Sequence, residues 1–142
     1  MRIVQLSVFM ENRVGHLSQV CQTLADCDIN ILALALADTS EFGILRLIVH
    51  RWEKAKAALE QANCTVNTVE VMALEVPDRP GGMEHILQVA EKAKLGIDYM
   101  YAFTLKRNEN AVLIIRFSDL ERAAAVFRDA DVHVIDATEF YG

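Results

Sequence analysis

The stretch "ENRVGHLSQV" at residues 11–20 places a single glycine, Gly15, between an alternating apolar segment and a segment with helical spacing. The stretch "PDRPGGMEHI" at residues 77–86 repeats this arrangement, with Gly81 in the equivalent position. A glycine at such a turn serves either a left-handed backbone conformation or a close approach to the main chain. Because the same turn occurs twice, the sequence indicates two copies of one unit.

The segments that surround the first turn predict a complete small unit. Residues 3–10 alternate between apolar and polar, as a half-buried strand does, and a helix is expected from about Gly15 to Asp26. The remaining expected elements are a strand at 30–38, a hairpin partner at 44–50, a helix around 55–62 and a strand at 66–71. The order is βαββαβ.

The same order recurs in the second half of the chain. We expect a strand at 72–76, a helix at 83–90 closed by a left-handed cap at Gly96, a hairpin of 98–106 with 111–118, a helix capped by Asp119, and a last strand at 133–140. The two copies align at an offset of 66 at the turn and of 68 from Ile29 onward, which predicts two extra residues in the helix region of the second copy. Such an internal repeat indicates a duplicated domain.

The predicted fold class is α+β. Two tandem ferredoxin-like βαββαβ modules, 1–71 and 72–142, would each form an antiparallel sheet with both helices on one face. The junction "TVNTVEVMALEV" contains no turn signal. Either one long strand serves both sheets, or the terminal strands are exchanged between the modules.

Several strands are apolar on both faces, which predicts a second cover for the sheets. Leu32 and Leu34 in the first copy, and Val112 and Ile114 in the second, form such rows. Large exposed apolar patches are unusual on monomers. We therefore expect a homo-oligomer, most simply a homodimer.

Composition excludes several classes of function. The net charge of -6 argues against nucleic acid, whose binding depends on Lys and Arg. Cys21, Cys27 and Cys64 lack the spacing of zinc or redox motifs, so we expect buried thiols in a reducing cytoplasm. The N-terminus has the pattern of a strand and not of a signal peptide, and no apolar run is long enough to span a membrane.

Catalytic machinery is not visible in the sequence. The turns lack the glycines and the Lys-Ser/Thr pair of a phosphate-binding loop, and they contain no nucleophile. The four histidines are scattered singly, so no metal site is predicted. We expect no catalytic residue, no metal and no cofactor.

The turn itself offers a binding site. A helix N-terminus presents free N–H groups, here around Gly15 and His16 or around Gly81 and Gly82, which suit a carboxylate. Asn12 and Asp78 each precede the glycine by three residues and could hold an ammonium or amide group. The structural alternative is that Gly15 only lets the helix start pack against a strand and that Asn12 only forms the turn.

The pattern Asn/Asp-Arg-(Val/Pro)-Gly-x-(Leu/Met) after a first strand, with "INI" and the βαββαβ order, resembles the ACT domain over nearly the whole chain. The resemblance implies modules that pair side by side into an eight-stranded sheet and bind amino acids at the shared interface, against the glycine turn. In serine-regulated dehydrogenases of this kind one Asn precedes the glycine and another opens the second strand, as Asn12 and Asn30 do here. Met10 replaces their ligand-contacting His, which argues against serine.

The resemblance implies a ligand-binding set in each copy, with the second copy more acidic. If the two copies of one chain pair, Asn12 faces Asp98 and Asp78 faces Asn30; if like copies pair across a dimer, Asn12 meets Asn30. The expected residues are Asn12, Val14, Gly15, His16, Leu17, Asn30 and Ile31 in the first copy, and Asp78, Gly81, Gly82, Met83 and Asp98 in the second.

The predicted function is that of a cytoplasmic, non-catalytic regulatory protein that senses an amino acid. The alternative is a constitutive regulatory subunit of a metabolic enzyme, similar to the small subunit of acetolactate synthase. A small ferredoxin-like enzyme is a third hypothesis, weakened by the missing acid–base or nucleophile set. The expected partners are an amino acid, a second copy of the chain and, in the alternative, an enzyme.

Overall fold

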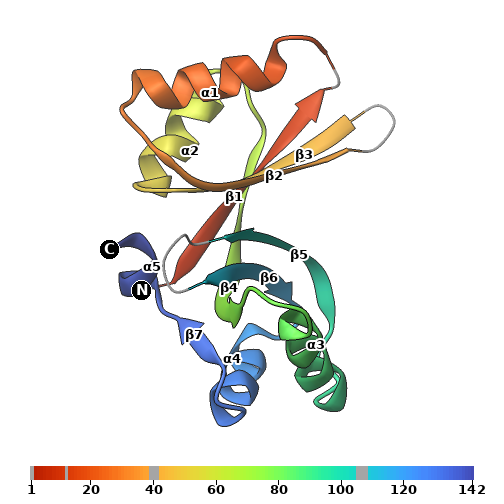
Figure 1. The fold of residues 1–142 in the computed structure, drawn as a ribbon. Helices are drawn as coiled ribbons and strands as arrows, with labels where there is room; N and C mark the ends of the chain where they lie inside the picture. The colour runs from red at the N-terminus through yellow and green to blue at the C-terminus, as the bar shows by residue number, and fades with distance from the viewer. Residues whose placement is uncertain (1, 12, 39–41, 105–108) are drawn as a thin grey trace. The chain divides into compact units, whose positions relative to one another are not determined.

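The computed structural model describes residues 2–11, 13–38, 42–104 and 109–142, and it divides into two compact units (Figure 1). The N-terminal unit is Val4–Val69, and the C-terminal unit is Glu70–Gly142 together with Met1–Ile3. The elements are β1 (Ile3–Glu11), α1 (His16–Asp26), β2 (Ile31–Asp38), β3 (Phe42–Val49), α2 (Trp52–Gln61), β4 (Val66–Pro77), α3 (Gly82–Lys92), β5 (Ile97–Thr104), β6 (Asn110–Phe117), α4 (Leu120–Asp129), β7 (His133–Ile135) and α5 (Ala137–Tyr141).

Each unit contains a four-stranded sheet with equivalent strand order. The order is β2-β3-β1-β4 in the N-terminal unit and β5-β6-β4-β7 in the C-terminal unit. In each unit two long helices cover one face of the sheet (Figure 1). The predicted pair of antiparallel βαββαβ modules is therefore confirmed.

Strand β4 belongs to both units. It runs without interruption over 12 residues, of which Val66–Val69 lie in the N-terminal unit and the rest in the C-terminal unit. The absence of a turn signal in "TVNTVEVMALEV" thus has a simple cause. One long strand ends the first repeat and begins the second.

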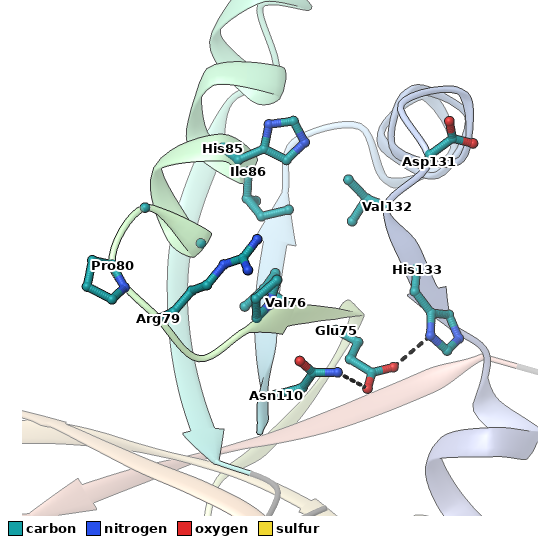
Figure 2. Close-up of a pocket in the computed structure, with 13 residues that line it drawn as sticks. Glu75, Val76, Arg79, Pro80, His85, Ile86, Asn110, Asp131, Val132 and His133 are labelled. Atoms are coloured by element: carbon teal, nitrogen blue, oxygen red, sulfur yellow. Dashed lines mark hydrogen bonds and ion pairs between the residues drawn. The ribbon is translucent and has the colours of Figure 1, made fainter. Parts of the chain in front are cut away.

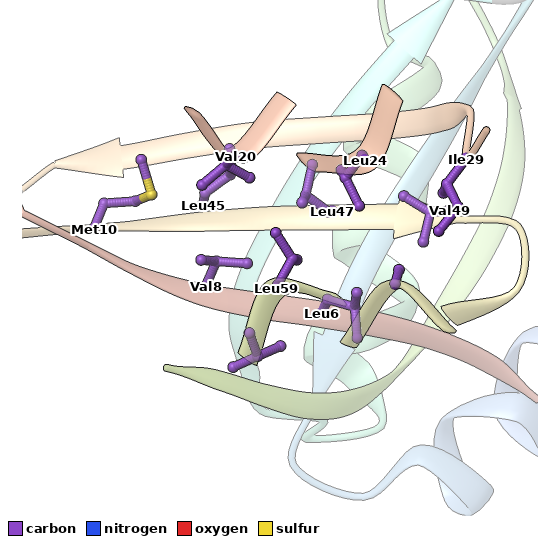
Figure 3. Packing of buried hydrophobic residues seen from close by; sticks show 12 residues of the cluster. Leu6, Val8, Met10, Val20, Leu24, Ile29, Leu45, Leu47, Val49 and Leu59 are labelled. Atoms are coloured by element: carbon purple, nitrogen blue, oxygen red, sulfur yellow. The ribbon is translucent and has the colours of Figure 1, made fainter. Parts of the chain in front are cut away.

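The core of the N-terminal unit follows the alternation of the strands. Side chains from β1 and β3 face Val20 and Leu24 of α1 and Leu59 of α2 (Figure 3). The C-terminal unit has an equivalent core, in which the rings of Phe117 and Phe127 lie 5.5 Å apart. Each Leu, Val or Phe side chain that is fully buried in these cores stabilises the fold by about 1.5–3 kcal/mol relative to an exposed one.

The strand register shows where the two copies differ in length. Leu34 pairs with Leu47 in the first hairpin, and Met100 pairs with Ile115 in the second. The offset between the copies is therefore 66 on the first strand of the hairpin and 68 on the second strand. Since α1 and α3 both have 11 residues, the predicted insertion in the helix region is wrong. The two extra residues lie between β5 and β6, where residues 105–108 are outside the described part of the chain.

The expected cap at Gly96 is also wrong. The left-handed residue after α3 is Lys94, with φ of 55°, while Gly96 does not have a positive φ. Glycine is favoured at position 96 for space, because a Cβ there would lie 2.6 Å from Oγ of Ser118. The predicted cap of α4 is confirmed, since the Asp119 side chain accepts a hydrogen bond from the N–H of Arg122.

The last strand is shorter than predicted. β7 ends at Ile135, and residues 137–141 form the helix α5 instead of continuing the strand. Asp136 explains the change, because its side chain accepts a hydrogen bond from the N–H of Glu139 and so caps a helix.

Two other expectations about burial are modified. Val112 and Ile114 are buried, whereas Leu34 is 53% exposed. The three cysteines are free and half-buried, not fully buried. Among the described helices, none combines the length and the apolar character required to cross a membrane.

The left-handed residue after α3 gives a test of this assignment. Replacing Lys94 by Gly should raise the free energy of unfolding by about 1 kcal/mol, because glycine adopts a positive φ without steric cost. Lys92→Gly, inside the last turn of the same helix, should lower it by about 1 kcal/mol. Chemical denaturation measures both, and a loss of stability in Lys94→Gly would contradict the assignment.

Candidate functional site

The two glycine turns have nearly identical backbone geometry. Gly15 has φ 90° and ψ -9°, and Gly81 has φ 88° and ψ -11°. The N–H of His16 donates to the carbonyl of Arg13 at 3.3 Å, and the N–H of Gly82 donates to that of Arg79 at 3.1 Å. These are the features of a type II turn, which requires a positive φ at its third residue.

The turn conformation therefore explains both glycines. A Cβ built on Gly15 or Gly81 would have no atom of the chain within 4 Å among the residues described. Close packing of the helix start against a neighbouring strand, the structural alternative raised by the sequence, is thus not the reason for Gly15. The same observation leaves open space beside the backbone at both turns.

The hydrogen bonds of the turn change the expected carboxylate contacts. The N–H groups of His16 and Gly82 already donate within their turns. The next N–H groups of each helix, at Leu17 and Met83, have no intrahelical acceptor because they lie in the first turn. A carboxylate is therefore better matched to these groups than to those of His16 and Gly82.

Two hollows border the turns at equivalent places. We call the first the Leu17 hollow and the second the Met83 hollow. The Leu17 hollow has a volume of about 130 Å³ and is lined by Met10, Glu11, Arg13, His16, Leu17, Leu36, Phe42 and Gly43. The Met83 hollow has a volume of about 610 Å³ and is lined by Val76, Pro77, Asp78, Arg79, Met83, Ala102, Phe103, Ala111 and Leu113.

Smaller side chains contribute to the larger volume of the Met83 hollow. Leu36 in the Leu17 hollow corresponds to Ala102 in the Met83 hollow, at the offset of 66 that the strand register gives. His16 corresponds to Gly82, which does not line the Met83 hollow. Ligand pockets commonly have volumes of about 300–1,000 Å³, so only the Met83 hollow has the usual size.

The predicted site residues are distributed over several places. His16 and Leu17 line the Leu17 hollow, and Asp78 and Met83 line the Met83 hollow. Gly81 and Gly82 line a different cavity of the C-terminal unit, described below. Val14 is fully exposed, and Asn12 lies outside the described residues.

Residues at the start of the second strand lie far from the turn of their own unit. Asp98 is next to Ile97, which pairs with Phe117 at one end of β6, whereas the turn follows Pro77, which pairs with Asn110 at the other end. At about 3.3 Å per residue these ends are roughly 20 Å apart.

The same separation holds in the N-terminal unit, where Ile31 follows Asn30 and pairs with Val49, at the end of β3 away from the turn. The register also makes Gly96, not Asp98, the counterpart of Asn30. Asp98 instead forms an ion pair with Arg116 at 3.8 Å.

A cluster that the sequence did not predict joins β4, β7 and α5. Nδ1 of His133 lies 2.7 Å from Oε2 of Glu75, its cross-strand partner (Figure 2). Nε2 of the same ring lies 2.9 Å from Oε1 of Glu139. Asn110 donates to the other oxygen of Glu75 at 2.9 Å. Each ring nitrogen thus has its own carboxylate, and only a protonated imidazole donates from both nitrogens.

The cluster also contains ligand types that suit a divalent metal. One atom from each of Glu75, His133 and Glu139 lies within 4.8 Å of the others. Burial lowers the pKa of His133, but hydrogen bonds and charges from Glu139 and Glu75 outweigh it and raise the pKa above its ordinary value. The geometry favours a proton on the ring, which holds α5 against the end of the sheet.

Comparison with known proteins agrees with this architecture. Residues 1–141 match the family described as the ACT domain pair. The chain belongs to the ACT domain pair family. A crystal structure of protein BT0572 from Bacteroides thetaiotaomicron is similar, with 35% identity, a TM-score of 0.92, and coverage of 99% of this chain and 96% of that chain.

More distant ACT structures share the fold. The regulatory subunit of aspartate kinase from Thermus thermophilus has 15% identity and a TM-score of 0.65, with 92% of each chain covered. The corresponding subunit from Thermus flavus has 15% identity and a TM-score of 0.66, with 90% of each chain covered. Among curated proteins no sequence match was found.

Some residues of this ACT pair were missed because they become neighbours only in the fold. Glu75 and His133 are 58 residues apart, and no local pattern connects them. Ala102 and Phe103 reach the Met83 hollow through the strand register. A signal was present at Arg79, which recurs with the turn as Arg13 does, but no role for its side chain follows from the sequence alone.

The cluster around His133 predicts a pH-dependent contribution to stability. Because the folded pKa is raised, the contribution is fully present below about pH 6.5 and is lost as the pH rises through the folded pKa. His133→Gln should therefore reduce the loss of stability between pH 6 and pH 8.5. Because the side chain is half exposed, we expect an effect below about 1 kcal/mol.

Thermal or chemical denaturation at the two pH values measures this effect. His85→Gln is the matched control, since His85 is exposed and outside the cluster, and it should retain the pH dependence of the wild type. Equal pH dependence of stability in His133→Gln and the wild type would rule out a contribution from the charged contacts of His133 with Glu75 and Glu139.

Proposed function

We propose that this ACT pair is a non-catalytic regulatory protein that binds an amino acid at its glycine turns, chiefly in the Met83 hollow. The observation that carries the proposal is the pair of equivalent hollows, one beside each turn. Two solved structures with the same fold are described as regulatory subunits of aspartate kinase, which supports a regulatory role by analogy.

The lining of the Met83 hollow matches the groups of an amino acid. Asp78 offers a carboxylate for the ammonium group, and the first turn of α3, which includes Met83, offers the positive end of the helix dipole for the carboxylate. Val76, Phe103 and Leu113 provide an apolar wall for the side chain. Convergent polar groups on an apolar wall are typical of small-molecule sites.

A second module would complete the site. The residues that open β2 and β5 lie far from the turns of their own units, so they can reach a ligand there only from another module. In the pairing of like modules Asn30 would face the Leu17 hollow, and in the pairing of unlike modules it would face Asp78.

The exposed apolar residues of the N-terminal unit support an alternative role as a constitutive subunit of an enzyme. Phe9 and Phe42 are 48% and 45% exposed, and their rings lie 5.2 Å apart on the sheet face away from the helices. Capture of an enzyme from lysate to the same extent with and without amino acids would favour this alternative. Capture that responds to an amino acid would favour the sensor.

The ligand prediction is tested by thermal shift with each of the twenty amino acids. One that binds the folded state alone should add about 2.7 kcal/mol to the free energy of unfolding at a hundredfold excess over its Kd. Ala102→Leu, which copies Leu36 of the other hollow, should abolish the shift by filling the Met83 hollow. Position 102 is exposed on β5, so the fold should be kept.

Leu36→Ala is the matched control and should leave the shift intact. Asp78→Ala should weaken binding about tenfold or more, because it removes a charged hydrogen-bond acceptor. No shift with any amino acid, or an unchanged shift in Ala102→Leu, would refute binding in this hollow. A shift lost in Leu36→Ala would move the site to the Leu17 hollow.

We also propose that the protein is a homodimer that pairs through edge strand β2. Leu34 and Leu36 are 53% and 51% exposed, and within the described strands β2 pairs only with β3. An exposed apolar edge strand is a template for pairing with a second chain. Light scattering at micromolar concentration should give twice the chain mass of 15.9 kDa.

Leu34→Glu should shift this mass toward that of the monomer, because the charge would be buried in the interface. Gln61→Glu, which adds the same charge at an exposed position of α2, should remain dimeric. A monomeric wild type would refute the proposal, and a dimeric Leu34→Glu would place the interface elsewhere.

A further inference from the structure

A cavity of about 570 Å³ lies between the second glycine turn, the start of α3 and the segment that connects α4 to β7 (Figure 2). We call it the Arg79 cavity. All its lining residues belong to the C-terminal unit. It shares Val76, Pro77 and Arg79 with the Met83 hollow but does not include Met83, Ala102 or Phe103. Its basic groups are Arg79, His85 and His133, and its acidic groups are Glu75 and Asp131. Val76, Ile86 and Val132 provide apolar walls.

The internal duplication supplies a reference for Arg79. Its counterpart Arg13 has two side-chain partners: Nε lies 3.4 Å from Oε2 of Glu11, and Nη2 donates to Oε1 of Gln19 at 3.3 Å. Burial raises the pKa of the Cys64 thiol, and the charge of Arg13 partly offsets this effect. Arg13 therefore lies near Cys64, the residue that corresponds to Val132. The two arginines thus extend toward equivalent regions of their units.

Every group that would engage or crowd Arg79 is replaced in the C-terminal unit. Glu11 corresponds to Pro77, and Gln19 corresponds to His85. His16, which is buried at the start of α1, corresponds to Gly82. Within residues 2–11, 13–38, 42–104 and 109–142, the Arg79 side chain has no ion pair or hydrogen bond.

Neither acidic residue that lines the cavity, Glu75 or Asp131, forms an ion pair with Arg79 within the described residues. Glu75 already accepts a hydrogen bond from Asn110 and contacts His133. In Figure 2 the Arg79 side chain extends from the turn toward Ile86. An exposed guanidinium without a protein partner, which lines an open cavity together with His85, is suited to bind an oxyanion through two parallel hydrogen bonds.

We propose that the Arg79 cavity binds the oxyanion group, a carboxylate or phosphate, of a small metabolite. This site is separate from the amino-acid site in the Met83 hollow and does not depend on it. The equivalent place in the N-terminal unit is not proposed as a site, because Glu11 and Gln19 contact Arg13 there. The duplication thus produced one copy that is satisfied internally and one that takes its anion from solution.

Titration of the ¹⁵N-labelled full chain tests the proposal by NMR. Sodium phosphate and sodium succinate are the probes, with sodium chloride at matched ionic strength as the reference. The Nε–H of Arg79 and the amides of Gly81 and Gly82 should shift saturably with at least one probe and not with chloride. The probe that binds more tightly distinguishes a phosphate from a carboxylate ligand.

Two variants should remove the site by different means. Arg79→Gln should weaken binding about tenfold or more, because it removes the charged donor. Pro77→Glu combined with His85→Gln should have a similar effect while keeping Arg79, because it restores the partners that engage Arg13. Agreement between the two variants excludes a general effect on folding as the cause.

Two control variants should retain the titration. Arg13→Gln removes the equivalent charge from the other unit, and Ala102→Leu fills the Met83 hollow without touching the Arg79 cavity. Binding lost in Ala102→Leu would assign the anion to the Met83 hollow and refute a separate site. Absence of saturation with both probes, equal shifts with chloride, or unchanged binding in Arg79→Gln would also overturn the proposal.

Discussion

The positive φ of one glycine at each turn is the constraint on which the architecture depends. A type II turn reverses the chain between a strand and a helix within four residues, and its third residue must be left-handed. The turn closes through the N–H of His16 or Gly82, and the helix begins at that same residue. Gly15 and Gly81 supply the left-handed conformation without help from neighbouring side chains. The residues around each turn can therefore change without moving the start of the helix.

The surroundings of the two turns have changed in a coupled way. The N–H of Glu11 donates to Nδ1 of His16 at 3.1 Å, and this ring is buried. In the other unit Pro77 has no N–H, so no acceptor is needed. A side chain at Gly82 would also collide with the carbonyl oxygen of Pro77, at 2.2 Å from a Cβ. The exchange of Glu11 for Pro77 and that of His16 for Gly82 therefore belong together. A residue with an N–H at position 77 would lack the acceptor that His16 provides to Glu11, and an unpaired buried N–H costs about 1–3 kcal/mol.

Local patterns predicted the elements, and contacts between distant segments determined the rest. Alternation and helical spacing located the strands and long helices because each element buries one face. The positions of Gly96 and Asp98 were misassigned because the length difference between the copies lies in the second hairpin and not near α3. Only the pairing of Met100 with Ile115 reveals that shift. The cluster of Glu75 with His133 and the free side chain of Arg79 also depend on tertiary contacts.

The asymmetry of the two units gives them different physical capacities. In the N-terminal unit Glu11, Gln19 and His16 satisfy the groups around the turn, so the turn is held by its own side chains. In the C-terminal unit the same backbone carries Pro77 and Gly82, and both sides of the turn are open. Since the backbone turn has nearly the same dihedral angles in both units, the open copy presents the same main-chain geometry with fewer side-chain contacts around it. In the proposed function, this difference in side chains around an unchanged turn is what lets the C-terminal turn bind a ligand without ordering the main chain, while the N-terminal turn is satisfied by its own side chains.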